Sequence, residues 1–386
     1  MKILFNVVLF SITLIFAQTP MTDQFSSVLK PIQKKYAPDK RTAIFSVTVR
    51  QNDSLLIVKG EVDNVQAKND VMAAFKKEFH TIADSIEVLP QQSLGEKTYG
   101  IVIVSVANMR SVPEESAELA SQVLMGHLVK LWKKKSGYYL AQSPDQYLGW
   151  VDNEQVIPVT QAEAEAWKNA KKVFVKAYFN YVRSEPKNDA FPVCDITGGG
   201  ILKDEGKQGS WRKISLADGR TGFLPDEDVM QYSDWGTKLH PLADNIERTG
   251  KYLMGVPYLW GGTSTKGVDC SGFTKTVYLL NGLQLNRDAN QQAEQGVAVE
   301  PGAHFENLKK GDLIFFGRRG DETKPERITH VGIYLGNQEF IHSSSRVHIS
   351  SFDPSSPIFD EGNLKRFIRA RRVIPSLSQL KEVKTK

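Results

Sequence analysis

Alternating apolar and polar positions in the first quarter of the chain predict a mixed structure. Residues 43–50 and 54–62 read as strands, residues 67–79 carry an amphipathic helical pattern, and residues 85–88 return as a strand. We therefore expect a small α+β module over residues 20–95. We find no catalytic motif in this module. It could be a spacer, a lid on an active site or a docking surface, and the sequence does not choose between them.

Short strands with turn residues between them follow, and they predict a small β-barrel over residues 96–160. The strands expected there are residues 100–106, 129–132, 138–141 and 149–151. An alanine- and glutamate-rich stretch, residues 161–170, then predicts a helical linker that we place over residues 161–172.

The barrel pattern recurs further along the chain. Residues 106–113 parallel residues 179–186, and residues 147–151 parallel residues 220–224. This internal repeat predicts a second small barrel over residues 173–235.

The C-terminal part combines a helix with a hairpin. Residues 271–281 predict a helix with Gly282 as its C-cap. Residues 328–335 and 339–343 read as strands, and Gly336-Asn337 between them is typical of a hairpin turn. We expect a separate domain over residues 236–375 and a loose lysine-rich tail over residues 376–386.

Composition adds bounds to this picture. A chain of 386 residues predicts two to four domains, and 41% hydrophobic with 24% charged residues is ordinary globular material. A net charge of +5 suits anionic wall polymers without singling them out. No lysine-arginine cluster is dense enough to predict a nucleic-acid partner.

The N-terminus predicts export. Met1-Lys2 gives a positive start, residues 3–16 are a short apolar run, and Ala17-Gln18 fits a cleavage point. We expect a signal peptide over residues 1–19, no stable membrane insertion after its cleavage, and a mature protein in the periplasm or outside the cell. An uncleaved membrane anchor is the alternative.

Cys270 is the candidate nucleophile. It lies at the start of the predicted helix, where free backbone N–H groups and the positive end of the helix dipole favour a thiolate. The alternative is a disulfide with Cys194, the second cysteine of the chain. The sequence around Cys270 favours the nucleophile, and Cys194 is then a small buried apolar residue.

His330 and His342 are the candidate partners of Cys270. Neighbouring antiparallel strands place two histidines side by side, so His330 would take the thiol proton and His342 would orient the His330 ring. A single histidine on a strand, without such a partner, is more often structural or exposed than catalytic. The remaining histidines have no candidate nucleophile or second histidine beside them in such a pattern, and they are treated as ordinary residues: His80, His127, His240, His304 and His348.

Metal and nucleotide chemistry find no support in the sequence. No close Cys-Cys or His-Glu-x-x-His spacing is present, and Gly198-Gly199-Gly200 lacks the lysine of a phosphate loop. We expect neither a metal nor a cofactor.

Six motifs in order make residues 240–375 resemble the NlpC family of papain-like cell-wall cysteine peptidases. They are Tyr258-x-Trp260-Gly-Gly, Asp269-Cys270-Ser271-Gly-Phe, Arg287-Asp288 with Gln291-Gln292, residues 311–316, residues 330–334 and Ile341-His342. The resemblance extends to members with two SH3-like domains ahead of the catalytic domain. It implies an α+β protein with a papain-like domain after two SH3-like barrels.

The resemblance also implies a substrate. Members cleave the γ-D-glutamyl–diamino acid bond of peptidoglycan stem peptides, and in this subgroup the substrate carries a free N-terminal L-Ala. Asp288 would pair with the free amine. The oxyanion hole would use the Cys270 N–H, helped by the Tyr258 hydroxyl. Further substrate contacts are expected from the pocket, from the flanks of the nucleophile and from the first barrel: Tyr258, Trp260, Asp269, Ser271, Glu118 and Tyr147.

Structural roles compete with these assignments. Trp260 could be core packing, Asp288 a helix N-cap, Glu118 a solvated loop residue and Tyr147 a barrel-edge aromatic. At the level of function, the alternative to a monomeric endopeptidase is a wall-binding protein whose papain-like domain is inactive or is another amidase.

Overall fold

The computed structural model describes residues 24–374, and they form two compact units that divide at Val88 and Leu89. The predicted signal peptide and the predicted tail both lie outside the described residues. Among the helices of residues 24–374, none combines the length and the hydrophobicity needed to cross a membrane.

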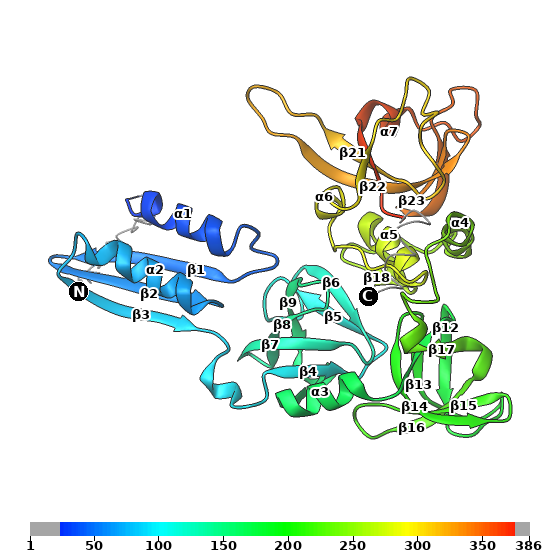
Figure 1. Ribbon diagram of the computed structural model, residues 1–386, viewed down its shortest axis with the longest axis horizontal. Helices are drawn as coiled ribbons and strands as arrows, with labels where there is room; N and C mark the ends of the chain where they lie inside the picture. Colours follow the sequence, from blue (N-terminus) through cyan, green and yellow to red (C-terminus); the bar gives the residue numbers. More distant parts are fainter. Residues whose placement is uncertain (1–23, 375–386) are drawn as a thin grey trace, which may run out of the picture. The chain divides into compact units, whose positions relative to one another are not determined.

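The first unit is the predicted α+β module. Its sheet has the order β1-β2-β3, with an antiparallel β1–β2 pair and a parallel β2–β3 pair joined by helix α2 (Figure 1). The helix begins and ends two to three residues earlier than the pattern predicted, and the helix before β1 was not predicted. The elements are α1 (Ser26–Tyr36), β1 (Phe45–Asn52), β2 (Leu55–Val62), α2 (Val65–Lys76) and β3 (Thr81–Val88).

Two seven-stranded barrels open the second unit, and they share one strand order. The first reads β6-β5-β9-β8-β7-β4-β10 and the second β13-β12-β16-β15-β14-β11-β17, so each strand has a counterpart seven strands later (Figure 1). Arg110 donates to the Ala117 carbonyl at 2.9 Å, and Arg183 donates to the Ala190 carbonyl at 3.0 Å. The internal duplication is therefore present in topology and in detail.

The strands of the first barrel are β4 (Tyr99–Val102), β5 (Val106–Arg110), β6 (Leu119–Leu124), β7 (Leu128–Lys135), β8 (Tyr138–Gln142), β9 (Leu148–Asp152) and β10 (Val156–Val159). The single strand predicted over residues 100–106 is wrong, because the chain turns and begins β5 at Val106. The second barrel consists of β11 (Lys172–Val175), β12 (Phe179–Arg183), β13 (Pro192–Thr197), β14 (Ile201–Gln208), β15 (Trp211–Ser215), β16 (Thr221–Pro225) and β17 (Val229–Gln231).

The predicted linker helix is α3 (Gln161–Asn169), and its start is encoded locally. The Thr160 hydroxyl accepts from the Glu163 N–H at 3.3 Å while the Glu163 carboxylate accepts from the Thr160 N–H at 2.8 Å. This capping box satisfies two N–H groups that the first helical turn leaves unpaired.

The last part of the chain packs helices on an antiparallel sheet of order β20-β25-β21-β22-β23-β24. Helix α5 lies against β22 and β23 in a core that includes Phe273, Val277, Val331 and Ile341. Its elements are α4 (Ala243–Tyr252), β18 (Thr263–Ser264), β19 (Gly267–Val268), α5 (Cys270–Leu279), α6 (Ala289–Gln292), β20 (Val297–Val299), β21 (Leu313–Arg318), β22 (Arg327–Gly336), β23 (Glu339–Ser344), β24 (Arg346–Ser351), α7 (Glu361–Arg366) and β25 (Phe367–Arg372).

The hairpin that carries the two histidines differs by one residue from the prediction. Gly336 pairs with Glu339, so the turn residues are Asn337 and Gln338, at φ of +50° and +64°. Two consecutive residues with positive φ are typical of a type I′ turn, which matches the twist of its strands.

Candidate active site

Cys270 is the first residue of helix α5, and Asp269 caps that helix by accepting from the Gly272 N–H at 2.7 Å. Gly272 lets the helix start pass close to the preceding turn, because a Cβ there would lie 1.9 Å from the Gly262 carbonyl oxygen. The backbone N–H groups of Ser271 and Val331 act on the Cys270 thiol in the direction that lowers its pKa. Val331 follows His330 on β22, so the thiol meets the strand that carries the candidate base.

Burial governs the protonation of this pair. Burial raises the pKa of the Cys270 thiol to about 11 and lowers the pKa of His330 to about 4. The two N–H groups act against the first shift, but they do not outweigh burial and the nearby Asp269 carboxylate. Both shifts favour the neutral forms, a thiol at Cys270 and an imidazole at His330, whereas the helix position alone predicted a thiolate.

Three side chains on neighbouring strands form a line behind Cys270. His330 Nε2 lies 2.7 Å from His342 Nδ1, and His342 Nε2 lies 3.1 Å from the Ser350 hydroxyl on β24. His342 is 1% exposed, and burial lowers its pKa to about 2. The prediction that the two histidines lie side by side is confirmed.

This line determines where the protons must lie if His330 acts as a base. Because His330 Nε2 is engaged by His342, only Nδ1 is left to take a proton from the thiol. His330 Nε2–H then donates to His342 Nδ1, and His342 Nε2–H donates to the Ser350 hydroxyl. Ser350 thus holds His342 in the tautomer that orients His330, a role that the sequence analysis did not assign.

The low pKa of His330 predicts an unusual acid limit for activity. The neutral imidazole is the form that accepts a proton, so kcat/KM should stay level from pH 7 to about pH 5 and fall through about pH 4. The measurement is a pH profile of kcat/KM, with circular dichroism at each pH to confirm folding. An acid limb near pH 6.5, the ordinary value for histidine, would contradict the burial argument.

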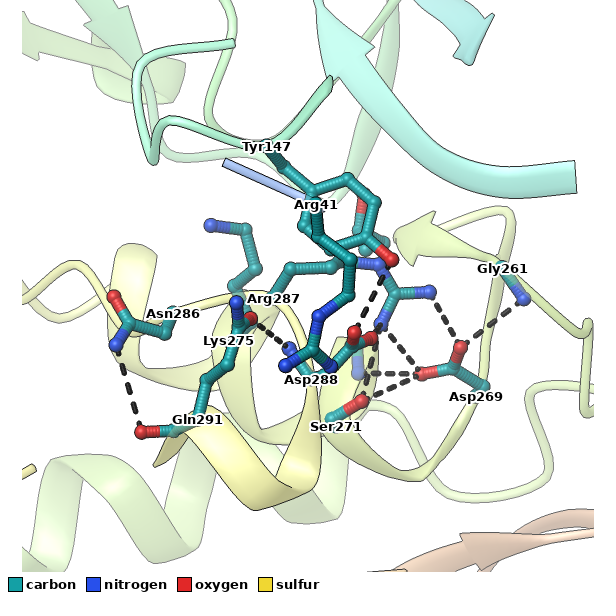
Figure 2. A network of polar contacts seen from close by, with 12 residues as sticks. Arg41, Tyr147, Gly261, Asp269, Ser271, Lys275, Asn286, Arg287, Asp288 and Gln291 are labelled. Carbon is teal, nitrogen blue, oxygen red and sulfur yellow. Dashed lines mark hydrogen bonds and ion pairs between the residues drawn. The ribbon is translucent and has the colours of Figure 1, made fainter. Parts of the chain in front are cut away.

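Arg287 organises the polar residues around the nucleophile (Figure 2). Its guanidinium donates to both carboxylate oxygens of Asp269, at 3.2 and 2.5 Å, and to the Ser271 hydroxyl at 3.0 Å. Asp269 also accepts from the Gly261 N–H at 3.0 Å. Since Arg287, Asp269 and Ser271 are all buried, this network holds the start of α5 in place. Direct contact of Asp269 or Ser271 with substrate stays a prediction.

Asp288 is both a helix cap and the meeting point of two domains. It is the N-cap of α6 in a capping box with Gln291, as the structural alternative predicted. Its carboxylate also accepts from the Tyr147 hydroxyl of the first barrel at 3.1 Å (Figure 2). Its carboxylate also lies 3.9 Å from the Arg287 guanidinium, and its side chain is 26% exposed. The geometry brings Tyr147 and Asp288 together, and contact of either with a substrate amine stays a prediction.

Glu118 and Trp260 form a second contact between the first barrel and the catalytic segment. The Trp260 indole N–H donates to the Glu118 carboxylate at 2.8 Å, although Trp260 is 62% exposed and so is not core packing. Gly261 permits this approach, because it adopts φ +80° and a Cβ there would lie 2.2 Å from the Leu119 carbonyl oxygen. Tyr258 is half-buried beside Cys270, and burial raises the pKa of its hydroxyl.

A buried ion pair joins the first barrel to the helix of the nucleophile. Lys275 of α5 lies 2.7 Å from the Asp145 carboxylate, and their side chains are 13% and 5% exposed. Nearby, the Gln122 side chain accepts from the Thr263 N–H at 2.9 Å. The sequence analysis did not name Lys275, and it named Arg287 only as part of a motif, without a role. A lysine inside an otherwise uncharged helix and an arginine next to Asp288 were the available signals.

The two cysteines are free thiols in the structure, so the alternative of a disulfide is wrong. Cys194 is partly buried against the core of the second barrel, somewhat more open than expected. Within residues 24–374, no three His, Cys, Asp or Glu side chains are grouped so as to hold a metal ion. His348, treated as an ordinary residue, packs its ring 4.4 Å from that of His342.

Comparison with known proteins identifies two of these regions. Residues 255–371 match the NlpC/P60 family, and residues 109–156 match the bacterial dipeptidyl-peptidase SH3 domain. A γ-D-glutamyl-L-lysine dipeptidyl-peptidase of Bacillus cereus is 30% identical over 267 residues, which cover 67% of this chain and 76% of the relative. Dipeptidyl-peptidase 6 of Lysinibacillus sphaericus is 27% identical, over 67% of this chain and 93% of that protein.

A solved structure agrees with the fold. The crystal structure of an NlpC/P60 family protein from Bacillus cereus superposes with a TM-score of 0.62 at 26% identity, covering 72% of this chain and all of that one. The expected α+β architecture, with SH3-like and NlpC-type domains, is confirmed. The chain belongs to the NlpC/P60 family and is a cysteine peptidase of peptidoglycan.

Proposed function

We propose that this peptidase hydrolyses the γ-D-glutamyl–diamino acid bond of stem peptides whose N-terminal L-Ala is free. The observation that carries the proposal is the Asp288 carboxylate, which lies against Tyr147 of the first barrel and is still partly exposed. A carboxylate at this place favours an ammonium group as its partner. Two relatives, from Bacillus cereus and Bacillus subtilis, are named γ-D-glutamyl-L-lysine dipeptidyl-peptidases, and these names support cleavage of the γ-D-glutamyl bond by this chain.

The first barrel supports the requirement for a free amine. Its contacts with the catalytic segment, Tyr147 with Asp288 and Glu118 with Trp260, border the site on the side of Asp288. A peptide that still carries muramic acid on its L-Ala has no ammonium for Asp288 and has to place a sugar against the barrel. Such a peptide is expected to bind poorly. The predicted signal peptide supports action outside the cytoplasm, where stem peptides are released.

The chemical steps start from a neutral Cys270 thiol and a neutral His330 imidazole. Cys270 Sγ attacks the γ-carbonyl carbon while its proton passes to His330 Nδ1, so the ion pair forms only as the new C–S bond forms. His330 then gives the proton to the leaving amine as the C–N bond breaks. Water, activated by the same imidazole, hydrolyses the thioester and restores the thiol. We expect the Cys270 N–H and the Tyr258 hydroxyl to stabilise the oxyanion.

Asp288→Asn tests the amine clamp without removing the helix cap, because asparagine caps a helix as well as aspartate does. We expect kcat/KM for a stem peptide with a free amine to fall roughly 10- to 100-fold, the loss of one charge-assisted hydrogen bond. The low activity on an N-acetylated peptide should not change. Asp244→Asn, at a side chain that is 90% exposed, is the matched control. An equal loss on both peptides would show that Asp288 acts only through structure.

A further inference from the structure

A buried amide joins the helix of the nucleophile to the segment that leads into α6. Gln292 is the last residue of α6 and is fully buried. Its Nε2 donates to the Asn286 carbonyl at 2.9 Å and to the Ser271 carbonyl at 3.0 Å, and its Oε1 accepts from the Thr274 hydroxyl at 2.7 Å. The side chain therefore bridges the first turns of α5 and the backbone before α6.

The orientation of this amide follows from its partners. A backbone carbonyl can only accept a hydrogen bond, so the two carbonyls face the NH2 group and the hydroxyl is left for the oxygen. Ser271, Thr274 and Gln292 are all buried, so water does not compete for these bonds. An amide that has both donors and its acceptor satisfied in such a place holds its partners in one geometry.

The two ends of the bridge adjoin the groups that the proposed function uses. Ser271 follows Cys270, and its N–H acts on the Cys270 thiol. Asn286 lies two residues before Asp288, whose carboxylate is the proposed amine clamp. Gln292 therefore links the backbone beside the nucleophile to the backbone beside the clamp.

Arg287 makes a second connection between the same two segments. Its guanidinium donates to the Ser271 hydroxyl at 3.0 Å (Figure 2), so Ser271 is held through its hydroxyl by Arg287 and through its carbonyl by Gln292. Arg287 also pairs with Asp269 and so contributes to the charge of the site. Among the described residues, the Gln292 side chain hydrogen-bonds only to uncharged partners, so its replacement changes the spacing of the two segments without changing that charge.

We propose that Gln292 is a positioning residue that sets the spacing between Asp288 and Cys270, and that this spacing makes the enzyme measure its cut from the free amine. The inference rests on the proposed function. A peptide whose ammonium is held by Asp288 presents its γ-carbonyl to Cys270 only when the spacing is correct, because a misplacement of about 1 Å can cost roughly 100-fold in rate. A peptide that Asp288 does not hold is independent of that spacing.

The test compares L-Ala-γ-D-Glu-L-Lys with Gly-L-Ala-γ-D-Glu-L-Lys, whose free amine lies one residue further from the bond. Both are also made with meso-diaminopimelate in place of lysine, and mass spectrometry of the products gives kcat/KM. The wild-type enzyme should cleave the shorter peptide at least about 10-fold faster, as the loss of one charge-assisted hydrogen bond predicts. Gln292→Met keeps the length of the side chain and removes its amide. It should lower kcat/KM on the shorter peptide roughly 10- to 100-fold and on the longer one by less, so that their ratio approaches one.

Gln295→Met is the matched control. Gln295 accepts from the Asn286 N–H at 2.8 Å and so holds the same segment, but it has no hydrogen bond to Ser271 within the described part of the chain. This variant should keep the ratio of the wild type. Thr274→Val removes the hydroxyl that donates to Gln292 and should lower the ratio in the same direction as Gln292→Met, by less. Since a ratio of two rates on one sample does not depend on the folded fraction, a loss of stability cannot imitate this effect.

Alkylation of Cys270 by iodoacetamide, followed by mass spectrometry on the fragment that contains it, separates spacing from reactivity. The rate should be the same in Gln292→Met as in the wild type, because the thiol keeps its neighbours. A fall in the alkylation rate as large as the fall in kcat/KM, or an unchanged ratio of the two peptides in Gln292→Met, overturns the inference and leaves the proposed function intact. Equal cleavage of the two peptides by the wild-type enzyme, or cleavage of neither, overturns both.

Discussion

Replacement of Cys270 by alanine is expected to lower kcat/KM on a stem peptide by about four orders of magnitude or more, because no other group can form the thioester. The protein should keep its fold, since the thiol contributes little to the core. The rate of product formation, followed by mass spectrometry with a matched thermal melt, is the measurement.

Cys194→Ala is the matched control. Burial raises the pKa of both thiols to about 11, so ionisation does not distinguish Cys194 from Cys270. The residues around each thiol distinguish them. Only Cys270 lies at a helix start beside His330, so Cys194→Ala should retain full activity. Substantial activity in Cys270→Ala would remove Cys270 as the nucleophile of the reaction.

Asp145→Asn is expected to have the largest effect on stability. It leaves Lys275 as a buried cation without its counter-charge, which costs about 3–5 kcal/mol in comparable pairs. Because Lys275 belongs to α5, the change should loosen the contact between the first barrel and the helix that begins at Cys270. We expect a lower urea midpoint for the second unit and a lower kcat/KM.

Asp195→Asn provides the comparison. Asp195, on β13 of the second barrel, forms an ion pair with Lys266 of the catalytic segment, and the two side chains are 32% and 43% exposed. An exposed pair contributes about 0–1 kcal/mol, so this variant should melt nearly as the wild type does. The double variant Asp145→Leu, Lys275→Met should recover much of the lost stability, because it removes both charges. Equal stability of Asp145→Asn and Asp195→Asn would contradict the account.

The sequence predicted those features that depend on short-range pattern. Alternation placed His330 and His342 on adjacent strands, and the parallel between residues 106–113 and 179–186 predicted the duplication of the barrel. It missed α1, whose sequence holds Pro31 and buries no residue completely. It also missed β6, which follows a loop without a clear alternating signal.

The protonation of Cys270 and the roles of Ser350, Lys275 and Arg287 could not be predicted in the same way. Each depends on what the fold brings from elsewhere: burial at the helix start, the line of rings across β22 to β24, and the barrel loop that carries Asp145. Helix position alone favours a thiolate, but the desolvation of the thiol depends on tertiary packing.

The central claim is most directly tested by mass spectrometry of the products from two stem peptides, one with a free L-Ala amine and one with that amine joined to muramic acid. We expect the wild-type enzyme to cleave the first alone, between D-Glu and the diamino acid. Cleavage of both at that bond would remove the amine clamp at Asp288, and cleavage of neither would contradict the proposed function as a whole.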